Sequence, residues 1–182
     1  YRLVHAFADL GLHLAPRDAL RLQHVYGTYQ ERIKLLPGMA GILSAAQAEG
    51  ALLGLLTNGP SVHQRDKIRV LGLGQWIEES HVFISAEIGA AKPDIRAFRK
   101  VQEALGLDAG HIYYIGDSFA NDVAGAKRAG WKAVWFNRRH HAVPGRDDYP
   151  DSRLGAGSGI TPDFTAAGAE ELAGIVRGIL KD

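Results

Sequence analysis

Short apolar runs alternate with segments of helical character along most of this chain. Four runs have the length and composition of buried strands: residues 52–56, 81–85, 112–115 and 132–136. The segments between these runs are predicted helices, because they have helix-forming composition or apolar positions at helical spacing. They are residues 61–71, 93–105 and 121–129. Strands that alternate with helices of this length indicate parallel pairing with helices on both faces. The pattern therefore predicts an α/β fold with a doubly wound parallel sheet.

The N-terminal section differs from the rest because it contains helical patterns and no strand pattern. Apolar residues recur at helical spacing over residues 3–10 and 20–33, and Pro37-Gly38 then interrupts the chain. We therefore expect a separate helical lobe over residues 1–36 and an α/β core over residues 37–182. Within this core we expect a short helix, a long polar loop and an amphipathic C-terminal helix, at residues 42–48, 138–162 and 172–179.

Length, charge and cysteine content narrow the class of protein. The 182 residues suffice for one large domain, or for a core domain with a small appendage. The formal net charge is +1 and the basic residues are scattered, which argues against a nucleic acid polymer or an anionic membrane as partner. Without cysteine, the chain has no disulfide, thiol nucleophile or cysteine metal site. Neither a membrane-spanning run nor a signal peptide is visible, and we expect a cytoplasmic protein.

The segment from residue 112 to residue 122 carries the strongest chemical signal. An apolar, strand-like run stops at Gly116, and two carboxylates, Asp117 and Asp122, follow in a turn that leads into a helix. Ligands of open α/β sheets bind at the carboxyl ends of the strands, and hard divalent cations prefer oxygen ligands on a rigid element. The segment therefore predicts a Mg²⁺ site. The alternative is that the two aspartates only cap the following helix.

Two other positions could bind an anion. Thr57-Asn58-Gly59 follows an apolar run and precedes a helix, so it offers a hydroxyl, backbone N–H groups and a helix N-terminus. A simple turn with a helix cap explains the same pattern. Lys92 lies just before Pro93 at a helix start, where its ammonium opposes the helix dipole. A bound phosphate or a nearby carboxylate would stabilise it there, unless the side chain is merely solvated.

The order and spacing of these three segments resemble motifs II, III and IV of the haloacid dehalogenase-like hydrolase superfamily. Thr57-Asn58-Gly59 matches the strand-ending threonine or serine, Lys92-Pro93 the lysine, and the run from Gly116 to Asp122 the acidic metal loop. The resemblance extends from about Pro37 to the C-terminus. It implies a Rossmann-like core with a small helical cap, of which residues 1–36 would be a part.

The same resemblance implies Mg²⁺-dependent hydrolysis of a small phosphorylated metabolite through an aspartyl-phosphate intermediate. Thr57 would bind the phosphoryl oxygens, with the backbone of Asn58 and Gly59 assisting, and Lys92 would neutralise the phosphoryl group. Asp117 would ligate Mg²⁺, and Asp122 would complete the metal site by orienting Lys92 or a metal-bound water. Trp135-Phe136-Asn137 resembles the nucleotidase-type branch, which implies a nucleoside 5′-monophosphate as substrate.

One motif of the family does not occur in this sequence. Its phosphatases carry Asp-x-Asp-x-Thr on the first strand, where the first aspartate is the nucleophile, and this chain contains no such motif. We expect that strand and its nucleophile to lie upstream of Tyr1. One alternative is a catalytically silent binding or scaffold protein. A second is a 2-haloacid dehalogenase, but that branch usually has Ser-Ser-Asn in place of a loop that begins with Gly116-Asp117.

Overall fold

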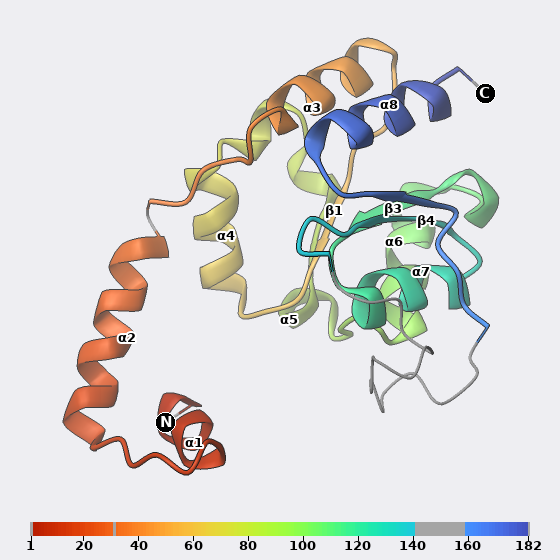
Figure 1. The fold of residues 1–182 in the computed structure, drawn as a ribbon. Coiled ribbons are helices and arrows are strands. Elements are labelled where there is room, and N and C mark those ends of the chain that lie inside the picture. Colours follow the sequence, from red (N-terminus) through yellow and green to blue (C-terminus); the bar gives the residue numbers. More distant parts are fainter. Residues whose placement is uncertain (1, 31, 141–158, 182) are drawn as a thin grey trace.

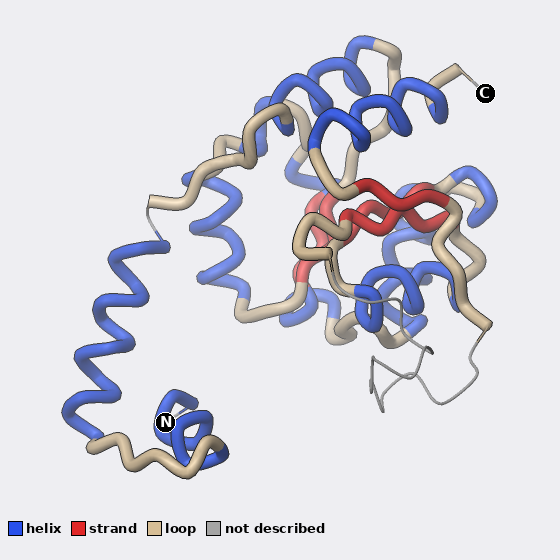
Figure 2. Tube along the Cα trace, in the orientation of Figure 1, coloured by secondary structure: helices blue, strands red, loops and turns tan. Residues whose placement is uncertain are grey.

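The N-terminal helices form a lobe that projects from the rest of the molecule. The computed structural model describes residues 2–30, 32–140 and 159–181. Helix α1 (Arg2–Asp9) contacts α2 (Pro16–Gln30), and both lie away from the sheets (Figures 1 and 2). Both helices were predicted, and α2 begins at Pro16, the residue through which we expected the chain to enter this helix. Proline fits this position because the first turn of a helix leaves its N–H groups unpaired.

Within the described residues, five parallel strands form two small sheets. In the first sheet, β1 (Leu55–Thr57) pairs with β2 (Val82–Ile84), and the last pair in register is Thr57 with Ile84. The second sheet has the order β3-β4-β5, from Tyr113–Gly116, Lys132–Phe136 and Phe164–Ala166. The predicted α/β fold with parallel strands is confirmed.

Helices cover both faces of the sheets, as Figure 1 shows. Helices α3 (Met39–Ala48) and α8 (Ala169–Ile179) lie side by side over one face, and α6 (Ile95–Leu105) and α7 (Ala124–Arg128) lie against the other. The residues of β4 alternate between these layers. Ala133 and Trp135 pack in the α6–α7 layer, whereas Val134 and Phe136 pack in the α3–α8 layer. This alternation places both faces of the strand in apolar surroundings, as doubly wound sheets require.

The shorter elements connect these layers. Helix α4 follows β1, and α5 follows β2, at Ser61–Val70 and Ser85–Ile88. Single turns of 3-10 helix occur at Leu73–Gln75, Glu79–His81 and Ala109–His111. Within the described ranges, no helix combines the length and the apolar character that crossing a membrane requires.

Several local predictions differ from the structure. Strand β5 was not predicted, because only one of its three residues is buried. The predicted strand at residues 81–85 is shorter, since a 3-10 turn precedes β2 and α5 follows it. The predicted helix at residues 121–129 begins as a π-helical turn, Phe119–Val123, before α7. Most of the predicted loop at residues 138–162 lies outside the described residues.

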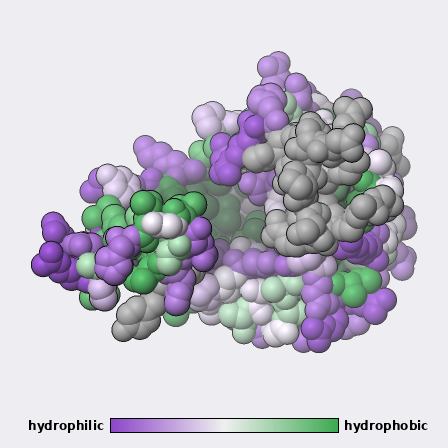
Figure 3. All heavy atoms as spheres, turned by 60° about the horizontal axis from the view of Figure 1, so that its bottom comes forward, coloured by the Kyte–Doolittle hydropathy of each residue, from purple (hydrophilic) through white to green (hydrophobic). Residues whose placement is uncertain are grey.

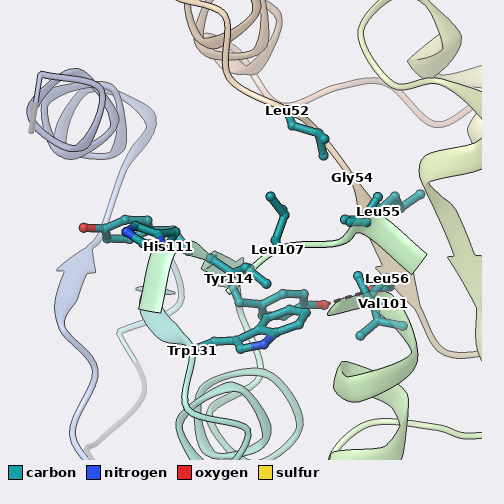
Figure 4. Close-up of a pocket in the computed structure, with 12 residues that line it drawn as sticks. Leu52, Gly54, Leu55, Leu56, Val101, Leu107, His111, Tyr114 and Trp131 are labelled. Carbon is teal, nitrogen blue, oxygen red and sulfur yellow. Dashed lines mark hydrogen bonds between the residues drawn. The ribbon is translucent and has the colours of Figure 1, made fainter. Parts of the chain in front are cut away.

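A pocket separates the two sheets. Its walls come mainly from β1, β3 and the end of α6, and they include Leu56, Val101, Tyr114 and Trp131 (Figure 4). One hydrogen bond crosses it: the Tyr114 hydroxyl donates to the backbone carbonyl of Leu56 at 2.9 Å. The two sheets are therefore joined here by side chains and not by a shared strand ladder.

Candidate active site

Three loops meet where β1 and β3 end. Thr57 is the last residue of β1, Lys92 follows α5, and Asp117 follows β3 directly. Because parallel strands present their carboxyl ends at one edge, this topology places the loops together. Asn58 contacts the main chain of Lys92, and the Lys92 side chain contacts Asp122, so the three predicted segments are in direct contact.

Lys92 carries a largely buried positive charge. Its side chain is only 11% exposed, and its Nζ donates to Asp122 Oδ1 at 2.7 Å and to the Tyr114 hydroxyl at 2.6 Å. The Nζ atom also lies 5.1 Å from the centre of the Tyr114 ring. A charge removed from water in this way needs such partners, because its desolvation costs several kcal/mol. The Lys92 side chain is therefore held in place by its contacts in the site and is not a solvated loop side chain.

Asp122 is the buried partner of this lysine. Its Oδ1 accepts from Lys92, and its Oδ2 accepts from the backbone N–H of Ser118 at 2.9 Å. Gly116 makes room for it, since a Cβ on that residue would lie 2.4 Å from Asp122 Oδ2. The glycine that precedes Asp117 is thus required by the close approach of a second carboxylate. Capping alone does not explain Asp122, because the N-cap of the following turn is Ser118, which accepts from Asn121 N, and the other oxygen of Asp122 accepts from Lys92.

Tyr114 is a site residue that the sequence reasoning missed. Its hydroxyl accepts from Lys92 Nζ and donates to the Leu56 carbonyl across the pocket. Burial, and then the carboxylates of Asp122 and Asp117, raise the pKa of Tyr114 well above its ordinary value. The phenol therefore stays protonated and neutral at physiological pH. The available signal was a tyrosine inside an apolar strand, where a buried hydroxyl needs a partner.

Thr57 and Gly59 form hydrogen bonds with residues of α4 and α5, the helices that follow β1 and β2. The Thr57 hydroxyl donates to Gln64 Oε1 at 3.1 Å, and the N–H of Gly59 donates to Ser85 Oγ at 2.9 Å. Gly59 has a φ of 145°, a backbone conformation that favours glycine. Among the described residues, no direct hydrogen bond joins the Thr57 hydroxyl to Lys92. Gln64 and Ser85 were not predicted, because their roles depend on the turn that they contact.

The side chain of Asn58 makes a pair of hydrogen bonds with the main chain of Lys92. Its Nδ2 donates to the Lys92 carbonyl at 2.8 Å, and its Oδ1 accepts from the Lys92 N–H at 2.9 Å. The Lys92–Pro93 peptide bond that follows is cis. The sequence pattern gave a role only to the backbone of Asn58, whereas the structure also places its carboxamide at the junction of two loops.

Asp117 presents an exposed carboxylate at the end of β3. Its backbone carbonyl accepts from Trp135 Nε1 at 3.2 Å, but within the described residues its carboxylate accepts no hydrogen bond. Both oxygens of Asp122, by contrast, are already bonded. In the part of the chain that the structure describes, no three His, Cys, Asp or Glu side chains gather in one place. The exposed carboxylate of Asp117 offers oxygen atoms, and oxygen is the donor that Mg²⁺ prefers.

Together these groups can bind a small anion beside a divalent cation. A buried ammonium, a hydroxyl and backbone N–H groups at a helix start are all hydrogen-bond donors for phosphoryl oxygens. The exposed carboxylate supplies negative charge for a cation next to them.

A family model of haloacid dehalogenase-like hydrolases matches residues 4–130. The chain is 38% identical over 124 residues to phosphoserine phosphatase of Thermus thermophilus, covering 68% of this chain and 49% of that relative. It is 30% identical to pyrimidine 5′-nucleotidase YjjG of Escherichia coli over 138 residues, which are 75% and 54% of the two chains. The chain thus spans about half the length of these curated relatives.

A similar solved structure is that of YfnB from Bacillus subtilis, which was solved bound to magnesium. Its TM-score is 0.70 at 25% identity, and the match covers 96% of this chain and 69% of YfnB. The residues that the family model matches include the three loops that meet around Lys92. The chain therefore belongs to the haloacid dehalogenase-like hydrolase family.

Proposed function

We propose that this protein is a Mg²⁺-dependent phosphomonoester hydrolase that acts on a small phosphorylated metabolite. The observation that carries the proposal is the buried pair of Lys92 and Asp122, held against the loop that follows Thr57. Such a pair offers a fixed positive charge beside an anion-binding turn. The names of the similar proteins, a phosphoserine phosphatase and a pyrimidine 5′-nucleotidase, support the same class of reaction.

In this proposal each loop has one task. The hydroxyl of Thr57 exchanges its bond with Gln64 for a bond to a phosphoryl oxygen. The N–H of Asn58 assists, and so does the N–H of Gly59, which exchanges its bond with Ser85 in the same way. Lys92 keeps Asp122 as partner and offers its remaining donor capacity to the phosphoryl group. Fixed donors of this kind lower the barrier because they need no reorganisation as charge develops.

Asp117 would hold the metal ion. When bound, Mg²⁺ neutralises charge on the transferring phosphoryl group and helps to orient it. We assign Asp117 as the direct ligand because its carboxylate is exposed and accepts no hydrogen bond among the described residues. Asp122 supports the metal site indirectly by fixing Lys92, since both of its oxygens already have partners.

The attacking carboxylate is proposed to come from a segment upstream of Tyr1. The pocket between β1 and β3 supports this idea, because apolar side chains line it and a strand there would join the two sheets. The helical lobe of residues 1–36 is proposed to be part of a larger cap. Large apolar side chains are exposed on it, among them Leu10, Leu20, Tyr26 and Tyr29. Figure 3 shows apolar surface on this lobe and a hollow between it and the core.

A nucleoside 5′-monophosphate is the substrate that we propose. The run Trp135-Phe136-Asn137 and the similarity to a pyrimidine 5′-nucleotidase support it. Phosphoserine and glyceraldehyde 3-phosphate belong in the same substrate panel, because proteins named for their hydrolysis are similar to this chain. Relative kcat/KM values over this panel identify the substrate.

The experiment is an assay of the full-length protein, upstream segment included, with an aryl phosphate and with or without Mg²⁺. We expect hydrolysis only with Mg²⁺, and its loss in Asp117→Asn. The matched control is Asp108→Asn, which makes the same substitution at an exposed position before β3. Wild-type turnover in Asp117→Asn contradicts the metal assignment.

Two other outcomes of this assay identify the alternative functions. An inactive full-length protein that still binds phosphorylated metabolites indicates a catalytically silent binding protein. Release of halide from a 2-haloacid without Mg²⁺ indicates a dehalogenase. The loop of Gly116 and Asp117 favours the phosphatase over both alternatives.

A further inference from the structure

We propose that Asn58 is a positioning residue that fixes the main chain of Lys92 relative to Thr57. The inference rests on the proposed function, because it assumes that Lys92 and Thr57 contact the same phosphoryl group. Asn58 donates to the Lys92 carbonyl at 2.8 Å and accepts from the Lys92 N–H at 2.9 Å. One carboxamide thus satisfies both main-chain groups of a residue 34 positions away in the sequence.

The orientation of this carboxamide is determined by its partners. A backbone N–H can only donate and a backbone carbonyl can only accept, so Oδ1 must face the N–H and Nδ2 the carbonyl. The paired backbone of β1 and β2 ends at Thr57 and Ile84, one residue before Asn58. The side chain therefore joins the two loops at the point where the strand pairing stops.

Lys92 connects the two sheets, and Asn58 holds one end of that connection. The ammonium group is bound by Tyr114 and Asp122, which belong to β3 and to the turn after it. The main chain is bound by Asn58, which follows β1. Without the carboxamide, the ammonium keeps its partners while the Lys92 backbone loses its tie to the turn of Thr57. The relative position of the two phosphate-binding groups then changes.

The expected kinetic result follows from this geometry. A displacement of about 1 Å in a catalytic arrangement can reduce the rate by about 100-fold. Asn58→Ala should lower kcat for an aryl phosphate by about 10- to 100-fold and change KM by less than about threefold, because all groups that bind the substrate remain. Asn58→Asp should also be impaired, because it places a carboxylate oxygen against the Lys92 carbonyl.

The matched control is Asp94→Ala, in the same loop. Asp94 accepts a hydrogen bond from the Arg96 N–H and caps α6, but it makes no hydrogen bond to Lys92 among the described contacts. Asp94→Ala loses this bond to the main chain and also the ion pair with the Arg96 side chain. It therefore measures how much a general loosening of the loop affects the rate. We expect its kcat to stay within about twofold of the wild type.

Two measurements on the full-length protein test the inference. In a double-mutant cycle, Asn58→Ala should lower kcat/KM by less than about twofold when Lys92 is already alanine, because its effect passes through Lys92. In hydrogen exchange followed by NMR, the Lys92 amide should exchange at least about tenfold faster in Asn58→Ala and not in Asp94→Ala.

Each outcome separates this inference from the proposed function. The role of Asn58 is overturned if Asn58→Ala lowers kcat/KM as much in the Lys92→Ala background as in the wild type. It is also overturned if the exchange rate of the Lys92 amide is unchanged. The hydrolase assignment stands in both cases. If the wild-type full-length protein hydrolyses no phosphomonoester, the proposed function fails. The exchange experiment then still shows whether Asn58 holds the main chain of Lys92.

Discussion

The buried ion pair of Lys92 and Asp122 leads to a quantitative prediction about stability. The two side chains are 11% and 7% exposed, and their charged atoms lie 2.7 Å apart. Asp122→Asn removes the negative charge and leaves the ammonium with the Tyr114 hydroxyl as its remaining partner in the described contacts. Removing one member of a buried pair costs about 3–5 kcal/mol. We expect about 3 kcal/mol, because the new amide can still accept from the Ser118 N–H.

The double variant distinguishes a lost charge from lost packing. Lys92→Met with Asp122→Asn leaves no unpaired charge, so its free energy of unfolding should lie within about 1 kcal/mol of the wild type. Urea unfolding can be followed by the fluorescence of Trp131 and Trp135, both only 2% exposed. Lys92→Met and Asp122→Asn could instead each lower the free energy of unfolding by a similar amount, with the two losses adding up in the double variant. That result would refute this reasoning.

An exposed ion pair provides the matched control for this experiment. Asp66 and Arg69 lie 3.3 Å apart on α4, with side chains that are 57% and 74% exposed. Solvent screens such a pair, so Asp66→Asn should change the free energy of unfolding by less than about 0.5 kcal/mol. A comparable loss in Asp66→Asn and in Asp122→Asn would contradict the assignment of Lys92–Asp122 as a desolvated pair.

Two further predictions concern the elements next to the site. Gly116→Ala should lower the free energy of unfolding in urea by about 1–3 kcal/mol and abolish most of the proposed phosphatase activity, because the new Cβ displaces Asp122. Unchanged activity there would contradict the close contact. Burial opposes the ionisation of Asp163, but bonds from Lys127 and the Ala133 N–H outweigh it and hold the pKa of Asp163 below its ordinary value. Asp163→Asn should therefore lower stability by about 1 kcal/mol at pH 7. This difference should begin to shrink below about pH 4, the ordinary pKa of aspartate, and should vanish once the pH falls below the lower pKa of folded Asp163, where the wild-type carboxylate takes up its proton. A difference independent of pH would exclude the ion pair as its cause.

The fold could largely be predicted because its strands carry local signals. The apolar runs that became β1, β3 and β4 end at turn residues, and helices separate them, so their parallel pairing follows from simple topology. Strand β5 lacks this signal. Phe164 and Thr165 are exposed, and the strand exists because it pairs with β4 in the register of Phe164 with Val134. That pairing depends on tertiary contacts, which cannot be predicted from the sequence of the three strand residues alone.

The site shows the same division between local and long-range information. Thr57, Lys92 and Asp117 could be selected because each follows or precedes a recognisable element. The contacts between them could not be predicted in the same way. The carboxamide of Asn58 and the hydroxyl of Tyr114 acquire their roles only when residues 34 and 22 positions away from their partners meet in the fold.

In the function that we propose, Asp117 and Lys92 act on one anion that is bound beside one cation. Vanadate, an analogue of the transferring phosphoryl group, tests it directly when its binding to the full-length protein is measured by titration calorimetry. We predict that wild-type protein binds vanadate tightly only when Mg²⁺ is present, and that Asp117→Asn abolishes this dependence on Mg²⁺. Lys92→Ala should weaken vanadate binding at least about tenfold. Equal affinity of all three proteins for vanadate, with or without Mg²⁺, would contradict a shared anion and metal site at Asp117 and Lys92.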